Sequence, residues 1–197
     1  MIEVADTFDR IYQSATWGVG SGPGSHPYFT IEYRLFLEKF IHLNGIASVI
    51  DFGCGDWQFS RFLNLAGVTY LGLDVVEALI KSNRDRFGSR NVEFKLAPDN
   101  LRELPHAELI VVKDVLQHLP NSEIQYVVEC ILSRCRFALV TNSYEKESAP
   151  HNIDVGGGGF RSLDLTSAPY NFEGAYVLEF WVKPWERVRT LLMRGTS

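Results

Sequence analysis

The stretch Ser48-Val49-Ile50-Asp51-Phe52-Gly53-Cys54-Gly55-Asp56-Trp57 decides the fold. An apolar run ends in an acidic residue, and two glycines at alternate positions follow. This order predicts a buried strand, a tight turn and a helix that begins near Gln58, because glycine lets the backbone pass close under a ligand. The N-terminus of such a helix offers unpaired N–H groups to that ligand. Local physics alone therefore predicts a nucleotide-type turn.

Length and composition bound the class of protein. The 197 residues are 46% hydrophobic and 22% charged, which predicts one globular domain over 1–197, with helices and a loop in 1–44 and a core in 45–197. The net charge of −5 disfavours nucleic acid or an anionic membrane as the main partner. No signal peptide, membrane-spanning run or CxxC pair is visible, so we expect a soluble cytoplasmic protein with free thiols.

Strand and helix patterns alternate after the Gly turn. This alternation predicts a doubly wound α/β fold with a mostly parallel sheet covered by helices on both faces, and with ligands at the carboxyl ends of its strands. Thr30 and Ser122 are expected to cap two of the helices. Strands are expected near 47–51, 69–73, 92–96, 109–112, 137–141, 176–182 and 187–193, and helices near 6–16, 30–43, 58–65, 76–87 and 121–135.

Two glycine-rich segments interrupt this alternation. The segment 17–27 contains five Gly or Pro residues between Trp17 and His26, and its aromatic borders favour a lid over a flexible linker. A second loop, near 142–170, contains four consecutive glycines at 156–159. In the last hairpin, Trp181 and Trp185 are expected to cover the core or the sheet edge.

Asp74 ends the second strand, nineteen residues after Gly55. In a doubly wound sheet an acid at this position faces a ribose, whose two hydroxyls can donate to its oxygens. A dinucleotide-dependent dehydrogenase would have the same acid, together with G-x-G-x-x-G. The third glycine of that pattern is absent here, which disfavours a nicotinamide cofactor.

Three motifs together resemble those of the class I S-adenosylmethionine-dependent methyltransferases. Ile50-Asp51-Phe52-Gly53-Cys54-Gly55 resembles their first motif, and Tyr70-Leu71-Gly72-Leu73-Asp74 resembles their second. The run from Leu109 to Leu119 resembles their fourth strand and the segment after it. The resemblance covers about residues 45–141 and departs from the family at Trp57, where most members have a further glycine. It implies a Rossmann-like sheet of seven strands with an antiparallel last strand, S-adenosyl-L-methionine as cofactor and S-adenosyl-L-homocysteine (SAH) as product.

The same resemblance implies roles for single residues. Gly53 and Gly55 would approach the methionine part of the cofactor, and Asp51 would orient its amino group directly or through water. Asp74 would bind the ribose, and Asp99 would bind the adenine amino group. Further cofactor contacts are expected from Cys54, Val75, Lys113 and Trp17.

Methyl transfer needs alignment of the acceptor, exclusion of water and, for a hydroxyl acceptor, a base. His118 and His26 are the candidate bases, each with the alternative of a histidine bonded only to nearby backbone or loop. Asp114 is a third catalytic candidate, because it follows the fourth strand where sulfonium and acceptor should meet. Arg161 is expected either to bind an acidic substrate group or to pair with a neighbouring aspartate. His151 and Asp154 provide too few ligands for a metal, and none is expected.

These observations leave three functions open. The first is methyl transfer to a small-molecule acceptor, with oxygen favoured over nitrogen because no Asn-Pro-Pro-Tyr-type tetrapeptide follows the fourth strand. The second is a nicotinamide-dependent oxidoreductase. The third is a partner subunit that keeps the fold and the cofactor without turnover.

Overall fold

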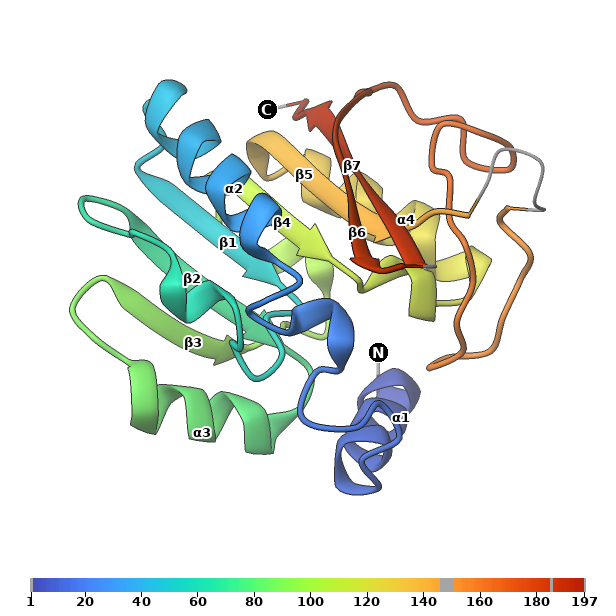
Figure 1. Ribbon diagram of the computed structural model, residues 1–197, viewed down its shortest axis with the longest axis horizontal. Helices are drawn as coiled ribbons and strands as arrows, with labels where there is room; N and C mark the ends of the chain where they lie inside the picture. Colours follow the sequence, from blue (N-terminus) through green and yellow to red (C-terminus); the bar gives the residue numbers. More distant parts are fainter. Residues whose placement is uncertain (1, 146–150, 185, 197) are drawn as a thin grey trace.

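Seven strands form one sheet in the order β3-β2-β1-β4-β5-β7-β6 (Figure 1). The computed structural model describes residues 2–145, 151–184 and 186–196, and the side chains of α1 from Ala5 onward. The strands are β1 Ser48–Phe52, β2 Thr69–Asp74, β3 Val92–Leu96, β4 Ala107–Lys113, β5 Cys135–Ser143, β6 Ala175–Lys183 and β7 Glu186–Arg194. The helices are α1 Ile2–Gln13, α2 Ile31–Leu43, α3 Glu77–Phe87 and α4 Asn121–Leu132.

The register of the sheet brings the ends of three strands together. β1 runs parallel to both β2 and β4, with Ile50 opposite Leu71 on one side and Ile110 on the other. The chain leaves β1 in one direction for β2 and returns on the other side as β4, so the strand order reverses beside β1. Such a reversal opens a crevice at the carboxyl ends of the strands. β7 runs antiparallel to β5 and β6, which confirms the predicted mostly parallel sheet with an antiparallel last strand.

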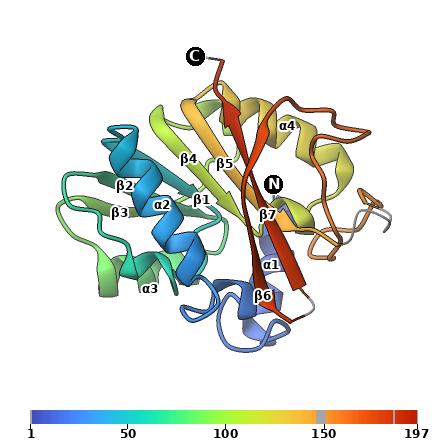
Figure 2. The same cartoon turned by 45° about the horizontal axis from the view of Figure 1, so that its top comes forward.

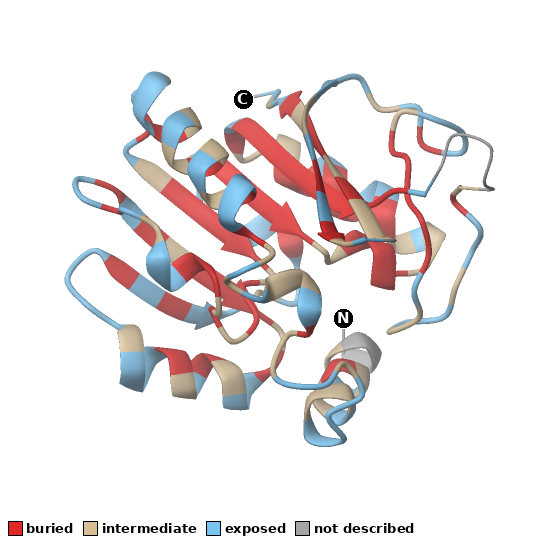
Figure 3. Ribbon diagram, viewed as in Figure 1, coloured by how far each residue is buried: buried red, intermediate tan, exposed pale blue. Residues whose placement is uncertain are grey.

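Helices cover the two faces of the sheet with separate apolar clusters. α2 contributes Tyr33, Leu37 and Ile41 to one cluster, and α4 contributes residues such as Ile124 and Val127 to the other. Figures 1 and 2 show α2 and α4 on opposite sides of the strands. The central strands are almost wholly buried in Figure 3, as expected for strands covered on both faces. The predicted doubly wound α/β fold is confirmed.

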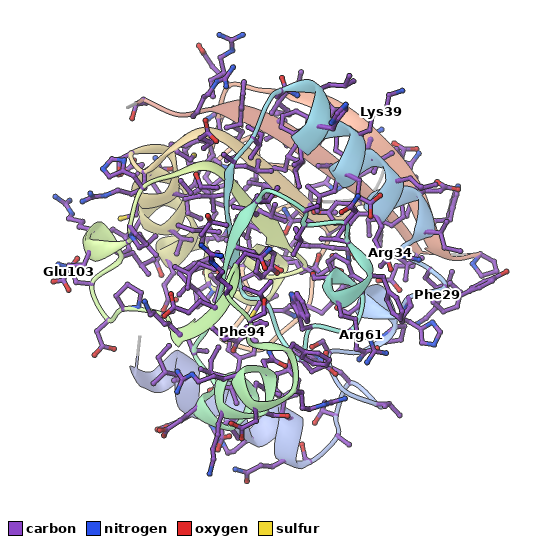
Figure 4. All side chains as sticks on the ribbon, turned by 90° about the vertical axis from the view of Figure 1, so that its left-hand side faces the viewer. Phe29, Arg34, Lys39, Arg61, Phe94 and Glu103 are labelled. Carbon is purple, nitrogen blue, oxygen red and sulfur yellow. The ribbon has the colours of Figure 1, made fainter. Side chains whose placement is uncertain are left out.

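The predicted helix after the Gly turn is wrong. Residues 58–65 contain only one 3₁₀ turn, Ser60–Phe62. Trp57 has a φ of +57°, and this left-handed conformation directs its indole into the core beside Phe94, a residue labelled in Figure 4. Because Trp57 and Phe59 are both buried, the segment follows the core instead of forming an amphipathic helix.

The two predicted caps have different outcomes. Thr30 occupies the N-cap position of α2 as predicted, but its hydroxyl makes no capping bond and donates to the carbonyl of His26. Ser122 lies within α4, whose N-cap position is occupied by Pro120. Trp181 is exposed on β6, which agrees with cover of the sheet edge, and Trp185 lies outside the described residues. In the described parts of the chain, no helix has the length and apolar character needed to span a membrane.

The first turn of α2 and the 3₁₀ turn meet through two arginines and an aromatic ring. The guanidinium groups of Arg34 and Arg61 lie 5.3 and 4.9 Å from the centre of the Phe62 ring. Figure 4 shows the two arginines near each other on this side of the molecule. These contacts attach the 3₁₀ turn to the first turn of α2.

Candidate active site

A cavity of about 340 Å³ lies where β1, β2 and β4 end. Its floor is the Gly turn after β1, and α1 with the following loop forms its roof. The cavity is lined by ten of the twelve residues predicted for the site: Trp17, Asp51, Gly53, Cys54, Gly55, Asp74, Val75, Lys113, Asp114 and His118. The sequence-derived motifs therefore converge on one space.

The other two predicted residues do not line this cavity. His26 is exposed, and its Nδ1 accepts a hydrogen bond from the backbone of Tyr28. Asp99 is exposed after β3, where Ala97 lines the cavity instead. His26 thus has the geometry of a loop histidine, and the predicted adenine contact of Asp99 has no support from its position.

At both glycines of the turn the backbone is left-handed, and a side chain would clash with neighbouring atoms. Gly53 has a φ of +80°, and a Cβ at this position would lie 2.3 Å from Val115. Gly55 has a φ of +53°, and its Cβ would lie 2.2 Å from the hydroxyl oxygen of Ser21. Both positions therefore require glycine for conformation and for space.

Asp74 joins the ends of β2 and the Gly turn. One carboxylate oxygen accepts from the backbone N–H of Gly55 at 2.9 Å, and the other accepts from Val76 at 3.0 Å. Burial raises the pKa of Asp74, and these two N–H groups oppose that rise. Each oxygen keeps a second lone pair, so the carboxylate can still accept hydrogen bonds from a pair of hydroxyls.

Only one oxygen of the Asp51 carboxylate accepts hydrogen bonds from the described residues. Its Oδ2 accepts from the hydroxyls of Tyr70 and Ser60, whereas Oδ1 has no hydrogen-bond partner among the described residues. Burial raises the pKa of Asp51 to about 6, against the lowering effect of these two hydroxyls. A cationic ligand in the cavity would favour the ionised form of this carboxylate.

The segment from 17 to 25 is closed over the Gly turn. Tyr12 and Ser21 share a hydrogen bond of 2.7 Å, and Ser21 also donates to Asp56 at 2.7 Å. At the other end of the segment, Nζ of Lys113 donates to the carbonyl of Gly24 at 2.8 Å. These contacts give the segment the position of a lid, which the aromatic borders of the sequence predicted.

Lys113 and Asp114 form a buried ion pair beneath this lid. Their side chains are only 3% and 16% exposed, and Nζ of Lys113 lies 5.7 and 5.6 Å from the ring centres of Tyr33 and Phe59. Asp114 adopts a φ of +57°, which is uncommon for a residue other than glycine. Its Oδ1 is buried without a partner among the described residues.

His118 presents one free ring nitrogen to the cavity. Its Nδ1 lies 2.6 Å from the carbonyl oxygen of Gly159, so Nδ1 carries the proton and donates it. Nε2 is then an acceptor, and no described residue bonds to it. Burial lowers the pKa of His118, which keeps the imidazole neutral near pH 7. The ring lies 4.9 Å from that of Trp17, centre to centre.

Several lining residues have no signal in the sequence that assigns them to the site. Gln117 is buried and its Oε1 accepts from the backbone of Ser143. Its Nε2 has no partner among the described residues. The other unpredicted lining residues include Phe8, Ser21, Phe160, Lys183 and Glu186. They come from segments distant in sequence, so only the folded chain groups them.

Arg161 and His151 have structural partners. Arg161 is buried and donates to the carbonyl of Gln117 and to Asn121, not to the aspartates considered for it. His151 stacks on Tyr144 with ring centres 4.5 Å apart. In the described segments, no group of three or more His, Cys, Asp or Glu side chains could hold a metal ion.

The strand order, the reversed β7 and the Gly turn at the crevice define a Rossmann-like cofactor-binding fold. Residues 50–131 match the family model of a methyltransferase domain. This match, together with the fold, confirms the resemblance to the class I S-adenosylmethionine-dependent methyltransferases. No protein of curated function matches the sequence.

Three solved structures illustrate the likeness. DhpI in complex with SAH has a TM-score of 0.63 and 18% identity, over 100% of this chain and 98% of that chain. Magnesium protoporphyrin IX methyltransferase (ChlM) from Synechocystis PCC 6803, with bound SAH, has a TM-score of 0.61 and 16% identity, over 84% and 83%. The N-terminal domain of EvdMO1, studied in the presence of SAH and D-fucose, has a TM-score of 0.61 and 14% identity, over 82% of each chain. At these identities the likeness concerns the fold.

Proposed function

We propose that the chain, acting as one domain over 1–197, is an S-adenosylmethionine-dependent methyltransferase for the hydroxyl group of a small molecule. The observation that carries this proposal is the convergence of the Gly turn, Asp74 and His118 on one lidded cavity. Structural relatives crystallised with SAH support the same cofactor and product here. The methyltransferase-domain match favours this function over the nicotinamide alternative.

The residues present fit this cofactor. Gly53 and Gly55 line the cavity and carry no side chain, so a ligand can lie against their backbone. Asp51 offers its unpaired Oδ1 to an ammonium group, and Asp74 offers its remaining lone pairs to ribose hydroxyls. When bound, S-adenosylmethionine supplies an electrophilic methyl group on a sulfonium. The carboxylates around the cavity suit its cationic charges.

His118 is the proposed general base. Its Nδ1–H donates to Gly159, so Nε2 could take the proton of an acceptor hydroxyl as the oxygen bonds to the methyl carbon, the carbon–sulfur bond breaks and SAH is released. Gln117 precedes it and has a free amide N–H group that can donate to the same oxygen. Nε2 of His118 accepts a hydrogen bond and the Gln117 amide donates one. This pair suits a hydroxyl group, which can donate and accept at the same oxygen.

The walls of the acceptor end favour a small, partly apolar molecule. Trp17 and Phe160 lie 4.9 and 5.9 Å from the His118 ring, centre to centre, and Phe8 lies 6.5 Å away. Lys183 and Glu186 border the cavity at the β6–β7 turn. A ring that bears a hydroxyl would pack on these aromatic side chains and exclude water from the methyl group.

The proposal is tested first by ligand binding and then by turnover. Calorimetry should detect S-adenosylmethionine and SAH at micromolar concentration but not NAD. SAH release should then be measured with matched panels of small alcohols, phenols and amines. His118→Gln should lower turnover about 10²–10⁴-fold without changing SAH affinity, whereas His42→Gln on the exposed face of α2 should change neither.

Each alternative predicts a different result. Binding of NAD alone would refute the proposed cofactor. SAH binding without turnover on either panel would favour the partner subunit. Turnover on amines that survives His118→Gln would refute the hydroxyl acceptor and its base.

A further inference from the structure

Trp57 stands where the resemblance to the first motif of the methyltransferase family predicts a further glycine. Its backbone conformation is nevertheless that of a glycine. Its φ of +57° lies in the left-handed region that favours glycine. The side chain is buried, with its ring 5.0 Å from that of Phe87 and 5.2 Å from that of Phe94. A bulky residue in this conformation has a free-energy cost that contacts with its surroundings must offset. The hydrogen bond of the indole N–H indicates what Trp57 contributes in return.

The indole is the first member of a directed chain of hydrogen bonds. Nε1 of Trp57 donates to the hydroxyl oxygen of Tyr70 at 2.9 Å. Because the indole nitrogen can only donate, the oxygen of Tyr70 is the acceptor and its own proton points elsewhere. That proton is donated to Oδ2 of Asp51. Burial raises the pKa of Tyr70 well above its ordinary value, so the hydroxyl keeps this proton.

The chain ends on a carboxylate with one occupied and one free oxygen. Oδ2 of Asp51 also accepts from Ser60 at 3.2 Å, so two hydroxyls fix this side of the group. Asp51 is 5% exposed and lines the cavity, and Oδ1 has no partner among the described residues. The carboxylate therefore cannot turn without breaking both bonds, and Oδ1 is left to accept from a ligand.

We infer that Trp57 and Tyr70 are positioning residues, which orient Asp51 so that Oδ1 binds the α-ammonium group of the cofactor. This inference rests on the proposed function, because it assumes a cofactor with an amino-acid part. It assigns a purpose to the departure from the glycine pattern: the indole N–H, which glycine lacks, fixes the direction of the Tyr70 proton.

The binding of two thioether nucleosides distinguishes this positioning role of Trp57 and Tyr70 from a general contribution to the stability of the fold. SAH carries the ammonium group, and 5′-methylthioadenosine has the same nucleoside without the amino-acid part. Tyr70→Phe should raise the dissociation constant of SAH about tenfold and change that of 5′-methylthioadenosine less than about twofold. Trp57→Phe, which keeps an aromatic ring without the N–H donor, should give a smaller change with the same selectivity.

Tyr176→Phe is the matched control, because its hydroxyl also donates to a carboxylate, that of Asp164, outside the cavity lining. This variant should leave both dissociation constants unchanged. A Tyr70→Phe variant that weakens both ligands equally, or neither, overturns the inference while the wild-type affinity for SAH still supports the proposed function. Wild-type protein that binds neither ligand refutes the proposed function and the inference with it. If Tyr70→Phe does not fold, the selectivity of Trp57→Phe decides between these outcomes.

Discussion

Replacement of Lys113 by Met tests whether the buried ion pair beneath the lid stabilises the fold. Methionine keeps a similar length and can still pack on the rings of Tyr33 and Phe59, but it removes the charge. Asp114 would then be a largely buried carboxylate without its cation. Loss of one partner from a buried pair costs about 3–5 kcal/mol. Because Asp114 remains 16% exposed, water screens part of this cost, and we expect about 3 kcal/mol.

Urea unfolding monitored by circular dichroism measures this change, with equal m-values as evidence that the unfolding reaction is the same. Lys95→Met is the matched control, since Lys95 pairs with Glu93 at the surface with side chains 55% and 62% exposed. It should cost less than about 0.5 kcal/mol. Adding Asp114→Asn to Lys113→Met should recover about 2 kcal/mol, because the buried charge is then gone and Asn tolerates a positive φ. Equal costs for the two lysines, or strict additivity in the double variant, would refute the reasoning.

Three further substitutions and one titration have expected outcomes. Burial raises the pKa of Asp51 from 3.8 to about 6, so ionisation of the folded protein costs stability as the pH rises between these values. Asp51→Asn should therefore gain about 3 kcal/mol in free energy of unfolding, relative to wild type, between about pH 4 and pH 7; a pH-independent difference would contradict this. Burial lowers the pKa of His118, so its NMR titration should have a midpoint below that of a free histidine, and the associated stability should be lost as the pH falls through the ordinary value of about 6.5. A midpoint at or above 6.5 would show that the ring is not desolvated. Asp74→Asn should weaken SAH binding by about 1–3 kcal/mol in calorimetry, and an unchanged affinity would exclude the ribose contact. Gly55→Ala would bring a Cβ to 2.2 Å from Ser21 Oγ, so hydrogen exchange within residues 17–25 should become faster; unchanged exchange would mean that the lid does not rest on the turn.

The sheet could be predicted because its signals are local. β4 is an apolar run that ends at Lys113, and the Lys183-Pro184 connection predicts an antiparallel pair from its shortness alone. Asp51 and Asp74 could be assigned to one site because parallel strands end at the same edge of a sheet.

The errors arose where tertiary packing overrides local pattern. The apolar residues of 58–65 have helical spacing, but the left-handed backbone of Trp57 turns the chain into the core and only a 3₁₀ turn forms. The bond from Lys113 to Gly24 joins residues 89 positions apart, and nothing in either segment indicates it. The two histidine candidates had similar merit in sequence. The folded chain places His118 at the cavity with its Nδ1 held by Gly159, whereas His26 is exposed and does not line the cavity.

Most walls of the proposed acceptor end come from segments outside the family-matched stretch 50–131, although the proposed base His118 lies inside it. Phe8 and Trp17 precede this stretch, whereas Phe160, Lys183 and Glu186 follow it. The residues proposed to hold the cofactor lie within it. On the proposed function, exchange of the glycine loop or the last hairpin should therefore change substrate preference and leave the residues proposed to bind the cofactor in place. The same separation would let a new acceptor be acquired in evolution through changes outside the residues proposed to bind the methyl donor.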